Sequence, residues 1–91
     1  MSYIVYIIRC ADKTLYTGIA VDVEKRLLEH NGERRGGAKY THGRRPVKLV
    51  YMEKCTSRSK ALIREHAIKK LSRIDKNKLI KQKRVSGKVS S

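Results

Sequence analysis

The chain has 91 residues, the size of one small domain, and its 23 Lys and Arg against 8 Asp and Glu give a formal net charge of +15. Such a charge attracts polyanions, whereas the two cysteines, without a CxxC spacing, exclude a disulfide framework or a zinc ribbon and suit reduced thiols. The longest apolar run, Tyr3 to Ile8, is too short to cross a bilayer, so the composition predicts a basic, cytoplasmic protein with no membrane partner.

The first half of the chain predicts a β-hairpin followed by a helix. Residues 3–8 are apolar on both faces and rich in β-branched side chains, as in a central strand. Turn residues then lead to a return strand over 15–19. Asp22 is a suitable N-cap for a helix that runs to about Asn31, where Gly32 would end it.

The second half of the chain predicts a loop, a third strand and two helices. Residues 32–46 hold four of the six glycines and the single proline, as expected of a loop. The elements after it are a strand over 47–53, a helix from Thr56 or Ser57 to about Leu71, and a short helix from Asp75 to Lys83. Together these elements predict an α+β fold in which helices flank a small three-stranded antiparallel sheet. The domain is expected to cover residues 1–83, with a flexible basic tail over 84–91.

Glu65 interrupts the apolar stripe of the longer of these two helices. It lies one helical turn from Leu62 and Ile68 and therefore points with them toward the core. A buried carboxylate without a partner is strongly unfavourable, so it must be paired, hydrogen-bonded or bound to a metal. A structural salt bridge to Lys69 or Arg58 is one interpretation, and a functional carboxylate is the other.

Five short motifs follow one another along the chain. They are Ile4-Val5-Tyr6, Tyr16-Thr17-Gly18, Arg26 with His30-Asn31, a glycine-rich loop with Lys39-Tyr40-Thr41, and Ala61-Leu62-Ile63-Arg64-Glu65. In this order and spacing they resemble the GIY-YIG nuclease domain, with IVY in place of GIY and YTG in place of YIG. The resemblance covers about residues 3–80, and the chain looks most like the small stand-alone members. It implies the same α+β fold and a metal-dependent endonuclease.

The resemblance implies catalytic roles for five side chains. Glu65 would hold a single Mg²⁺ or Mn²⁺ ion that activates water, and Arg26 would stabilise the negative charge of the transition state. Tyr16 would position or deprotonate the attacking water, with Tyr6 as its support and His30 placed to polarise a tyrosine. Taken alone, Tyr6 equally suits a core residue, Arg26 a solvated arginine and His30 a cation at a helix C-terminus.

Residues that contact nucleic acid are expected beside the second tyrosine motif, in the basic loop and at the end of the longer helix. Gly18 would open space beside Tyr16 for a phosphate and a water, and this favours Tyr16 over Tyr6 as the group that acts on the water. Tyr40 is either a base-stacking platform or a loop anchor. The full set of expected contacts is Gly18, Arg34, Arg35, Lys39, Tyr40, Arg44, Arg45, Lys69 and Lys70.

Two functions suit these residues. The first is a divalent-metal-dependent endonuclease that hydrolyses phosphodiester bonds in DNA, and RNA stays open as a second substrate. Its candidate role is structure-selective cleavage in repair or recombination. The second is a nucleic-acid-binding module that keeps the fold without turnover. The positive charge suits both equally, whereas the set of Tyr16, Arg26 and Glu65 favours the enzyme.

Overall fold

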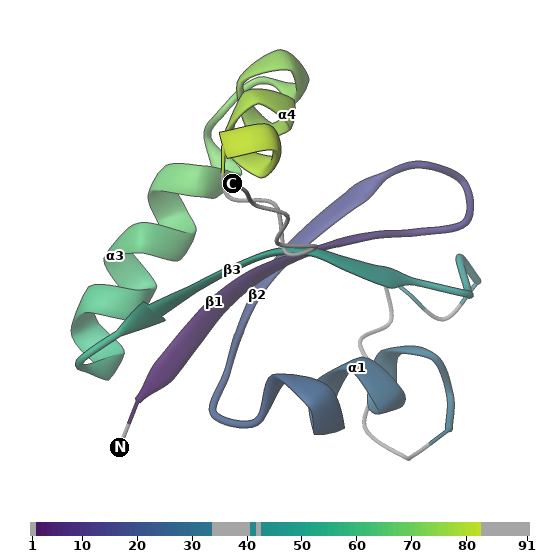
Figure 1. Cartoon of the computed structure of the whole chain (residues 1–91), viewed down its shortest axis with the longest axis horizontal. Helices are drawn as coiled ribbons and strands as arrows, with labels where there is room; N and C mark the ends of the chain where they lie inside the picture. Colours follow the sequence, from purple (N-terminus) through teal and green to yellow (C-terminus); the bar gives the residue numbers. More distant parts are fainter. Residues whose placement is uncertain (1, 34–40, 42, 83–91) are drawn as a thin grey trace.

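A computed structural model describes residues 2–33, 41 and 43–82 of the chain. Its elements are, in chain order, β1 (Tyr3–Arg9), β2 (Leu15–Ala20), α1 (Val23–His30), β3 (Lys48–Cys55), α3 (Arg58–Lys69) and α4 (Arg73–Gln82). The strands form one antiparallel sheet in the order β2-β1-β3, with α1 on one face and α3 and α4 on the other (Figure 1). This architecture confirms the predicted α+β fold. None of the described helices has the length and apolar character needed to span a bilayer.

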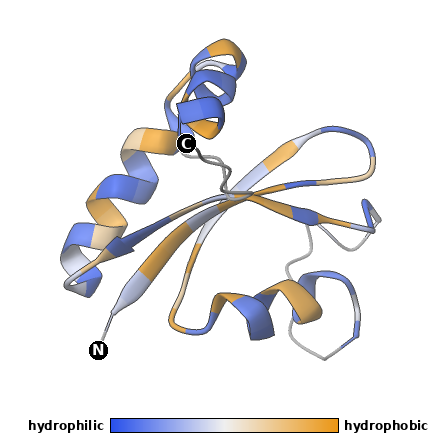
Figure 2. Cartoon of the chain, viewed as in Figure 1, coloured by the Kyte–Doolittle hydropathy of each residue, from blue (hydrophilic) through white to orange (hydrophobic). Residues whose placement is uncertain are grey.

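β1 is the central strand, and its alternating side chains divide the core into two layers. Tyr6 and Ile8 belong to the cluster that α1 covers, whereas Val5 and Ile7 pack with Ile68 of α3 in the other. Figure 2 shows hydrophobic residues along this strand at the centre of the molecule. Because both faces of β1 are covered, its sequence is a continuous apolar run instead of an alternating one.

The strand register brings the two tyrosine motifs side by side. β1 pairs antiparallel with both neighbours, and Tyr6 lies opposite Gly18 of β2. β3 extends two residues beyond the predicted end at Glu53, because Cys55 still pairs with Tyr3. Within the sheet that the structure describes, β2 is an edge strand, with β1 as its single strand neighbour.

Two of the helices begin at the N-caps that the sequence predicts. Asp22 accepts a hydrogen bond from the backbone N–H of Lys25 at 3.0 Å, and Ser57 accepts one from the N–H of Lys60 at 3.2 Å. Gly32 follows the end of α1 with a φ of 80°, a left-handed conformation that favours glycine. Local capping chemistry therefore sets the ends of α1 and the start of α3.

α4 begins earlier than predicted. The sequence analysis placed its start at Asp75, but the hydroxyl of Ser72 accepts a hydrogen bond from the Asp75 N–H at 3.1 Å and the helix begins at Arg73. Asp75 lies instead in the first turn, where a carboxylate interacts favourably with the helix dipole. The predicted helix end at Lys83 and the predicted tail over 84–91 lie outside the described residues.

Candidate active site

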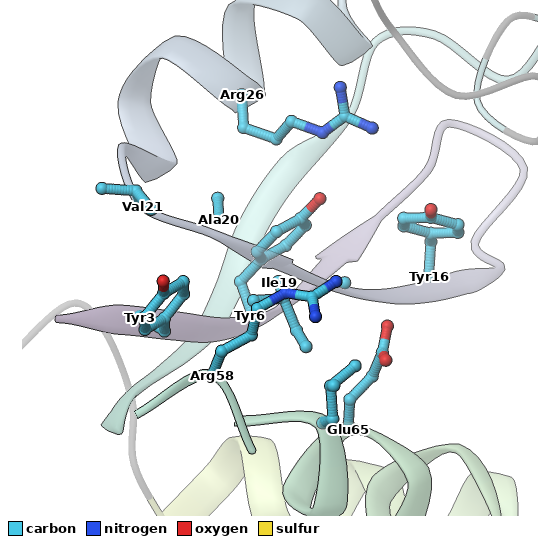
Figure 3. Close-up of a pocket in the computed structure, with 11 residues that line it drawn as sticks. Tyr3, Tyr6, Tyr16, Ile19, Ala20, Val21, Arg26, Arg58 and Glu65 are labelled. Carbon is cyan, nitrogen blue, oxygen red and sulfur yellow. The ribbon is translucent and has the colours of Figure 1, made fainter. Parts of the chain in front are cut away.

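A pocket of about 420 Å³ opens along the outer edge of β2, between α1 and α3 (Figure 3). Four of the five predicted catalytic side chains line it: Tyr6 from β1, Tyr16 from β2, Arg26 from α1 and Glu65 from α3. The fifth, His30, lies behind the wall that Tyr6 forms. Residues from four separate elements therefore meet at the place that the motif order predicts.

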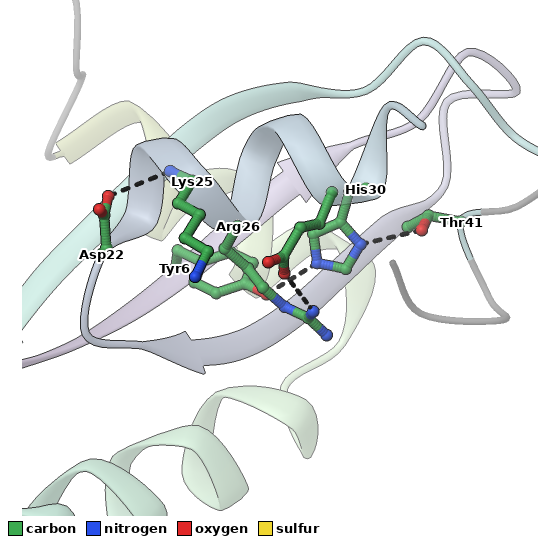
Figure 4. Close-up of polar contacts among 7 residues, drawn as sticks. Tyr6, Asp22, Lys25, Arg26, His30 and Thr41 are labelled. Atoms are coloured by element: carbon green, nitrogen blue, oxygen red, sulfur yellow. Dashed lines mark hydrogen bonds and ion pairs between the residues drawn. The ribbon is translucent and has the colours of Figure 1, made fainter. Parts of the chain in front are cut away.

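Tyr6, His30 and Thr41 form a buried hydrogen-bonded chain behind this pocket (Figure 4). The Tyr6 hydroxyl lies 2.8 Å from Nε2 of His30, and Nδ1 of the same ring lies 2.9 Å from Oγ1 of Thr41. Tyr6 is 2% exposed, and the other two residues are 0% exposed. Because both ring nitrogens have a partner, the imidazole is held in one orientation.

Burial sets the protonation of this chain. Desolvation raises the pKa of Tyr6 to about 12, although hydrogen bonding and charge from Arg26 oppose the rise. Desolvation also lowers the pKa of His30 to about 4, and the positive charge of Arg26 acts in the same direction. Both groups are therefore uncharged at neutral pH. One ring nitrogen of His30 carries a proton and donates a hydrogen bond, and the other nitrogen accepts a hydrogen bond.

Gly18 makes room for the ring of Tyr6. A Cβ at this position would lie 2.6 Å from the Tyr6 hydroxyl oxygen and 2.7 Å from its Cζ. The sequence analysis expected the missing side chain to open space for a phosphate and a water. The Tyr6 ring of the protein itself fills the space where a side chain of residue 18 would lie. Gly18 still lines the pocket, and its contact with a phosphate and a water stays a prediction.

Tyr16 also lies against His30 and keeps more exposed surface than Tyr6. Its ring meets the imidazole edge-on, with centroids 5.2 Å apart and planes at 63°. The corresponding distance from Tyr6 to His30 is 5.9 Å. Tyr16 is half-buried at the pocket wall, so a water in the pocket can reach it more easily than it can reach the enclosed Tyr6.

Arg26 is held over the pocket by an acidic residue of its own helix. Its Nη1 lies 2.8 Å from Oε1 of Glu29, and the two side chains are 29% and 15% exposed. Burial alone would lower the pKa of Arg26, but its hydrogen bonds with Glu29 and Tyr6 outweigh that effect and raise it. The guanidinium is therefore a fixed positive charge next to the Tyr6 hydroxyl.

Glu65 enters the pocket from α3, opposite Arg26 (Figure 3). Its Oε2 lies 3.3 Å from Nζ of Lys69, and its side chain is 15% exposed. Of the two salt-bridge partners considered from the sequence, Lys69 is therefore the one the structure supports, and no ion pair joins Glu65 to Arg58. Leu62, predicted to share the buried stripe, is 36% exposed and lines the pocket instead.

The donor set suits a single hard cation. Glu65 is the carboxylate that lines the pocket, and the part of the chain that the structure describes holds no group of three His, Cys, Asp or Glu side chains that could bind a metal. Mg²⁺ is usually held by one or two carboxylates together with waters and substrate phosphates, and Mn²⁺ shares its preference for oxygen ligands. A lone carboxylate beside an arginine agrees with this pattern, whereas a structural zinc site needs four ligands.

The predicted nucleic-acid contacts differ in what they do in the fold. Arg44 Nε lies 3.0 Å from Oδ2 of Asp12, and Arg45 Nε donates a hydrogen bond to the carbonyl oxygen of His30 at 2.8 Å. These two arginines therefore attach the loop to the turn between β1 and β2 and to the end of α1. Lys70 is exposed at the end of α3. The remaining loop residues of the prediction, Arg34, Arg35, Lys39 and Tyr40, lie outside the described residues.

Three residues of the site had no catalytic or binding role assigned from the sequence. Glu29 was detectable, because an acid three residues after Arg26 on a helix forms an ion pair on one face. Thr41 lies within a family motif, but nothing in the sequence connects it to His30. Arg58 belongs to no motif, and the structure alone places it in the pocket.

Comparison with known proteins gives the family of the chain. The GIY-YIG catalytic domain matches residues 2–79. The UPF0213 protein of Syntrophus aciditrophicus is 60% identical over 78 residues, which cover 86% of this chain and 88% of the relative. A UPF0213 protein of Staphylococcus saprophyticus is 53% identical over 78 residues, which cover 86% of this chain and 93% of the relative.

Two solution NMR structures share the fold. The UPF0213 protein BH0048 from Bacillus halodurans is 39% identical, with a TM-score of 0.60, and the match covers 93% of this chain and 88% of the other. The protein EF2693 from E. faecalis is 38% identical, with a TM-score of 0.62, over 90% of this chain and 85% of the other. The chain therefore belongs to the GIY-YIG nuclease family, which confirms the resemblance seen in its motifs.

Proposed function

We propose that this protein is a divalent-metal-dependent endonuclease that hydrolyses phosphodiester bonds in DNA. The observation that best supports the proposal is the convergence of Tyr16, Arg26 and Glu65 on one pocket at the β2 edge of the sheet. Metal-assisted hydrolysis of a phosphodiester uses a metal ligand, a cation for the developing charge and a group that positions water. These three side chains are of the required types, and they come from three different elements.

Glu65 would hold the metal. Its Oε2 is engaged by Lys69, while Oε1 makes no hydrogen bond with any residue that the structure describes and can take a ligand. A divalent ion bound there would supply Lewis-acid activation of water and stabilise the leaving oxygen. The protein contributes the placement of this carboxylate, which the rigid helix α3 holds at the mouth of the pocket.

Arg26 and Tyr16 would act on the scissile phosphate and on the water. The guanidinium donates to phosphoryl oxygens as their negative charge grows, and the ion pair with Glu29 fixes its direction in advance. Tyr16 would orient the attacking water through its hydroxyl. Tyr6 stays protonated, because its pKa is raised to about 12, and holds His30 against the back of the site.

A nucleic-acid-binding module without turnover is the second candidate. The observation in its favour is the ion pair between Glu65 and Lys69, which satisfies the carboxylate without any metal. Such a module would use the net charge of +15 to bind DNA and would not hydrolyse it.

Incubation of supercoiled plasmid with the protein in Mg²⁺, in Mn²⁺ or in a chelator separates the two functions. The endonuclease produces nicked and linear DNA in metal and none in chelator. A binding module retards the DNA in all three conditions and leaves it supercoiled, which would refute the proposal.

A second set of substrates defines the preferred nucleic acid. Single-stranded, duplex, nicked and branched oligonucleotides and an RNA of the same sequence are compared under the metal condition that supports cleavage. Preferential cleavage of nicked or branched DNA would support a role in repair or recombination. Preferential cleavage of the RNA would contradict the assignment of DNA as the substrate.

A further inference from the structure

Arg58 brings a second arginine to the active-site pocket. It is the first residue of α3 and lines the pocket. Figure 3 shows its side chain extending from the helix into the pocket, with Tyr3 on one side and Glu65 on the other. Arg26 is paired with Glu29, whereas Arg58 makes no hydrogen bond or ion pair with any residue in the described ranges.

The position of Arg58 is not explained by the stability of its helix. The first turn of a helix carries a partial positive charge and favours acidic side chains. The first turn of α3 contains no acidic residue and holds both Arg58 and Lys60. Arg58 is an exposed cation that lines the pocket and has no partner among the described residues, so it is suited to an anion that comes from outside the chain.

The pocket has room for more than the scissile phosphate. Its volume of about 420 Å³ lies in the range of about 300–1,000 Å³ that is typical of sites for small organic ligands. From the catalytic groups it continues toward Tyr3 and Val21, which are uncharged, and Arg58 is the cation beside them. A nucleotide that adjoins the scissile bond would meet this end of the pocket.

We propose that Arg58 binds a second phosphate, that of the nucleotide next to the scissile bond on the Tyr3 side. The inference rests on the proposed function, since it assumes a nucleic-acid strand along the edge of β2. A planar guanidinium can donate two parallel hydrogen bonds to one phosphate, which gives direction as well as charge. Arg26 would then take the scissile phosphate and Arg58 its neighbour, so the two arginines set the register of the strand.

The first test measures DNA binding in chelator for Arg58→Gln and for the matched control Lys60→Gln. Both changes remove one positive charge from the same helical turn, but Lys60 does not line this pocket. Arg58→Gln is expected to weaken binding about tenfold and to lower the log–log salt slope on duplex DNA by about 0.9. Lys60→Gln is expected to weaken binding less than about threefold, because Lys60 is exposed like Arg58 but does not line the pocket. Equal losses in the two variants would overturn the proposal.

The second test locates the phosphate. Oligonucleotides carrying one neutral methylphosphonate at successive positions are bound by the wild type, by Arg58→Gln and by Arg26→Gln. Neutralising a phosphate that contacts an arginine lowers the affinity of the wild type. The same neutralisation has no effect on the affinity of the variant that lacks this arginine. We expect the phosphate coupled to Arg58 to be the immediate neighbour of the one coupled to Arg26, and coupling to no position or to a distant one would refute the assignment.

These binding measurements keep the two proposals separate. They are made in chelator, so they report on Arg58 whether or not the protein cleaves DNA. A failure to cleave in metal would refute the nuclease function and leave the coupling of Arg58 to a phosphate intact. Cleavage in metal without any coupling to Arg58 would refute the second phosphate site alone.

Discussion

Replacing Gly18 by alanine perturbs the site at its tightest contact. The new Cβ would lie 2.6 Å from the hydroxyl oxygen and 2.7 Å from Cζ of Tyr6, well inside the about 3.5–4.0 Å at which carbon atoms rest in contact. Tyr6 cannot simply move aside, because it is 2% exposed and its hydroxyl is hydrogen-bonded to His30 at 2.8 Å. Either the ring shifts and breaks that bond, or the strands separate locally.

The contact geometry gives the size of the expected effect. Overpacking of a closely packed core destabilises a protein by about 1–3 kcal/mol. Loss of the hydrogen bond would leave a nitrogen of the fully buried His30 without its partner, which adds about 1–3 kcal/mol. The smaller unfolded-state entropy of alanine offsets up to about 1 kcal/mol. These terms span a decrease in the free energy of unfolding of about 1–6 kcal/mol. The middle value of about 3 kcal/mol lowers the Tm of a domain of this size by about 10 °C or more.

Urea and thermal unfolding followed by circular dichroism measure this effect, with Gly43→Ala as the matched control. Among the described residues, no atom lies within 4 Å of a Cβ built at Gly43, so the same substitution there should change the free energy of unfolding by less than about 0.5 kcal/mol. If Gly18→Ala and Gly43→Ala unfold at the same temperature and urea concentration, the close approach of Tyr6 to Gly18 is wrong.

Three further predictions concern the residues around His30. Tyr16→Phe should lose most of the cleavage activity and Tyr6→Phe should keep more, because the Tyr6 hydroxyl is buried against His30 and its pKa is raised to about 12. The pH–rate profiles of both variants measure this, and the opposite order of activity would assign the attacking water to Tyr6. Arg26→Ala should slow single-turnover cleavage about 10²–10³-fold and weaken DNA binding far less, whereas equal losses would make Arg26 an ordinary phosphate contact. His30 has a pKa of about 4 in the fold and about 6.5 when unfolded, so below pH 6.5 the unfolded chain binds a proton that the folded chain does not. Its contribution to stability is therefore complete above pH 6.5 and decreases by about 3 kcal/mol as the pH is lowered toward 4; urea unfolding at several pH values should show this acid-side loss in the wild type and not in His30→Gln.

Local signals account for the parts of the fold that could be predicted. The apolar run of β1 and the caps Asp22 and Ser57 act within a few residues, so the sequence predicts them directly. The predicted start of α4 was wrong because Ser72 and Asp75 are both suitable N-cap residues. Only the backbone path shows that the Ser72 hydroxyl accepts a hydrogen bond from the Asp75 N–H.

The candidate site was predictable in part of its membership but not in its geometry. Motif order was sufficient to place Tyr6, Tyr16, Arg26 and Glu65 in one pocket. The bond between Tyr6 and His30 joins residues 24 apart, and it depends on how α1 packs against β1, which no local pattern encodes. For the same reason the sequence could not show that the Tyr6 ring occupies the space at Gly18.

Cleavage of supercoiled plasmid in Mg²⁺ by the wild type, Glu65→Gln and the control Glu24→Gln tests the central claim most directly. Glu24 is an exposed acid of α1 that does not line the pocket, so its replacement removes the same charge without touching the site. We predict that the wild type and Glu24→Gln nick the DNA at similar rates, whereas Glu65→Gln binds DNA, keeps its circular dichroism spectrum and produces no nicks. Nicking by Glu65→Gln at the wild-type rate would contradict the assignment of this pocket as a metal-dependent nuclease site.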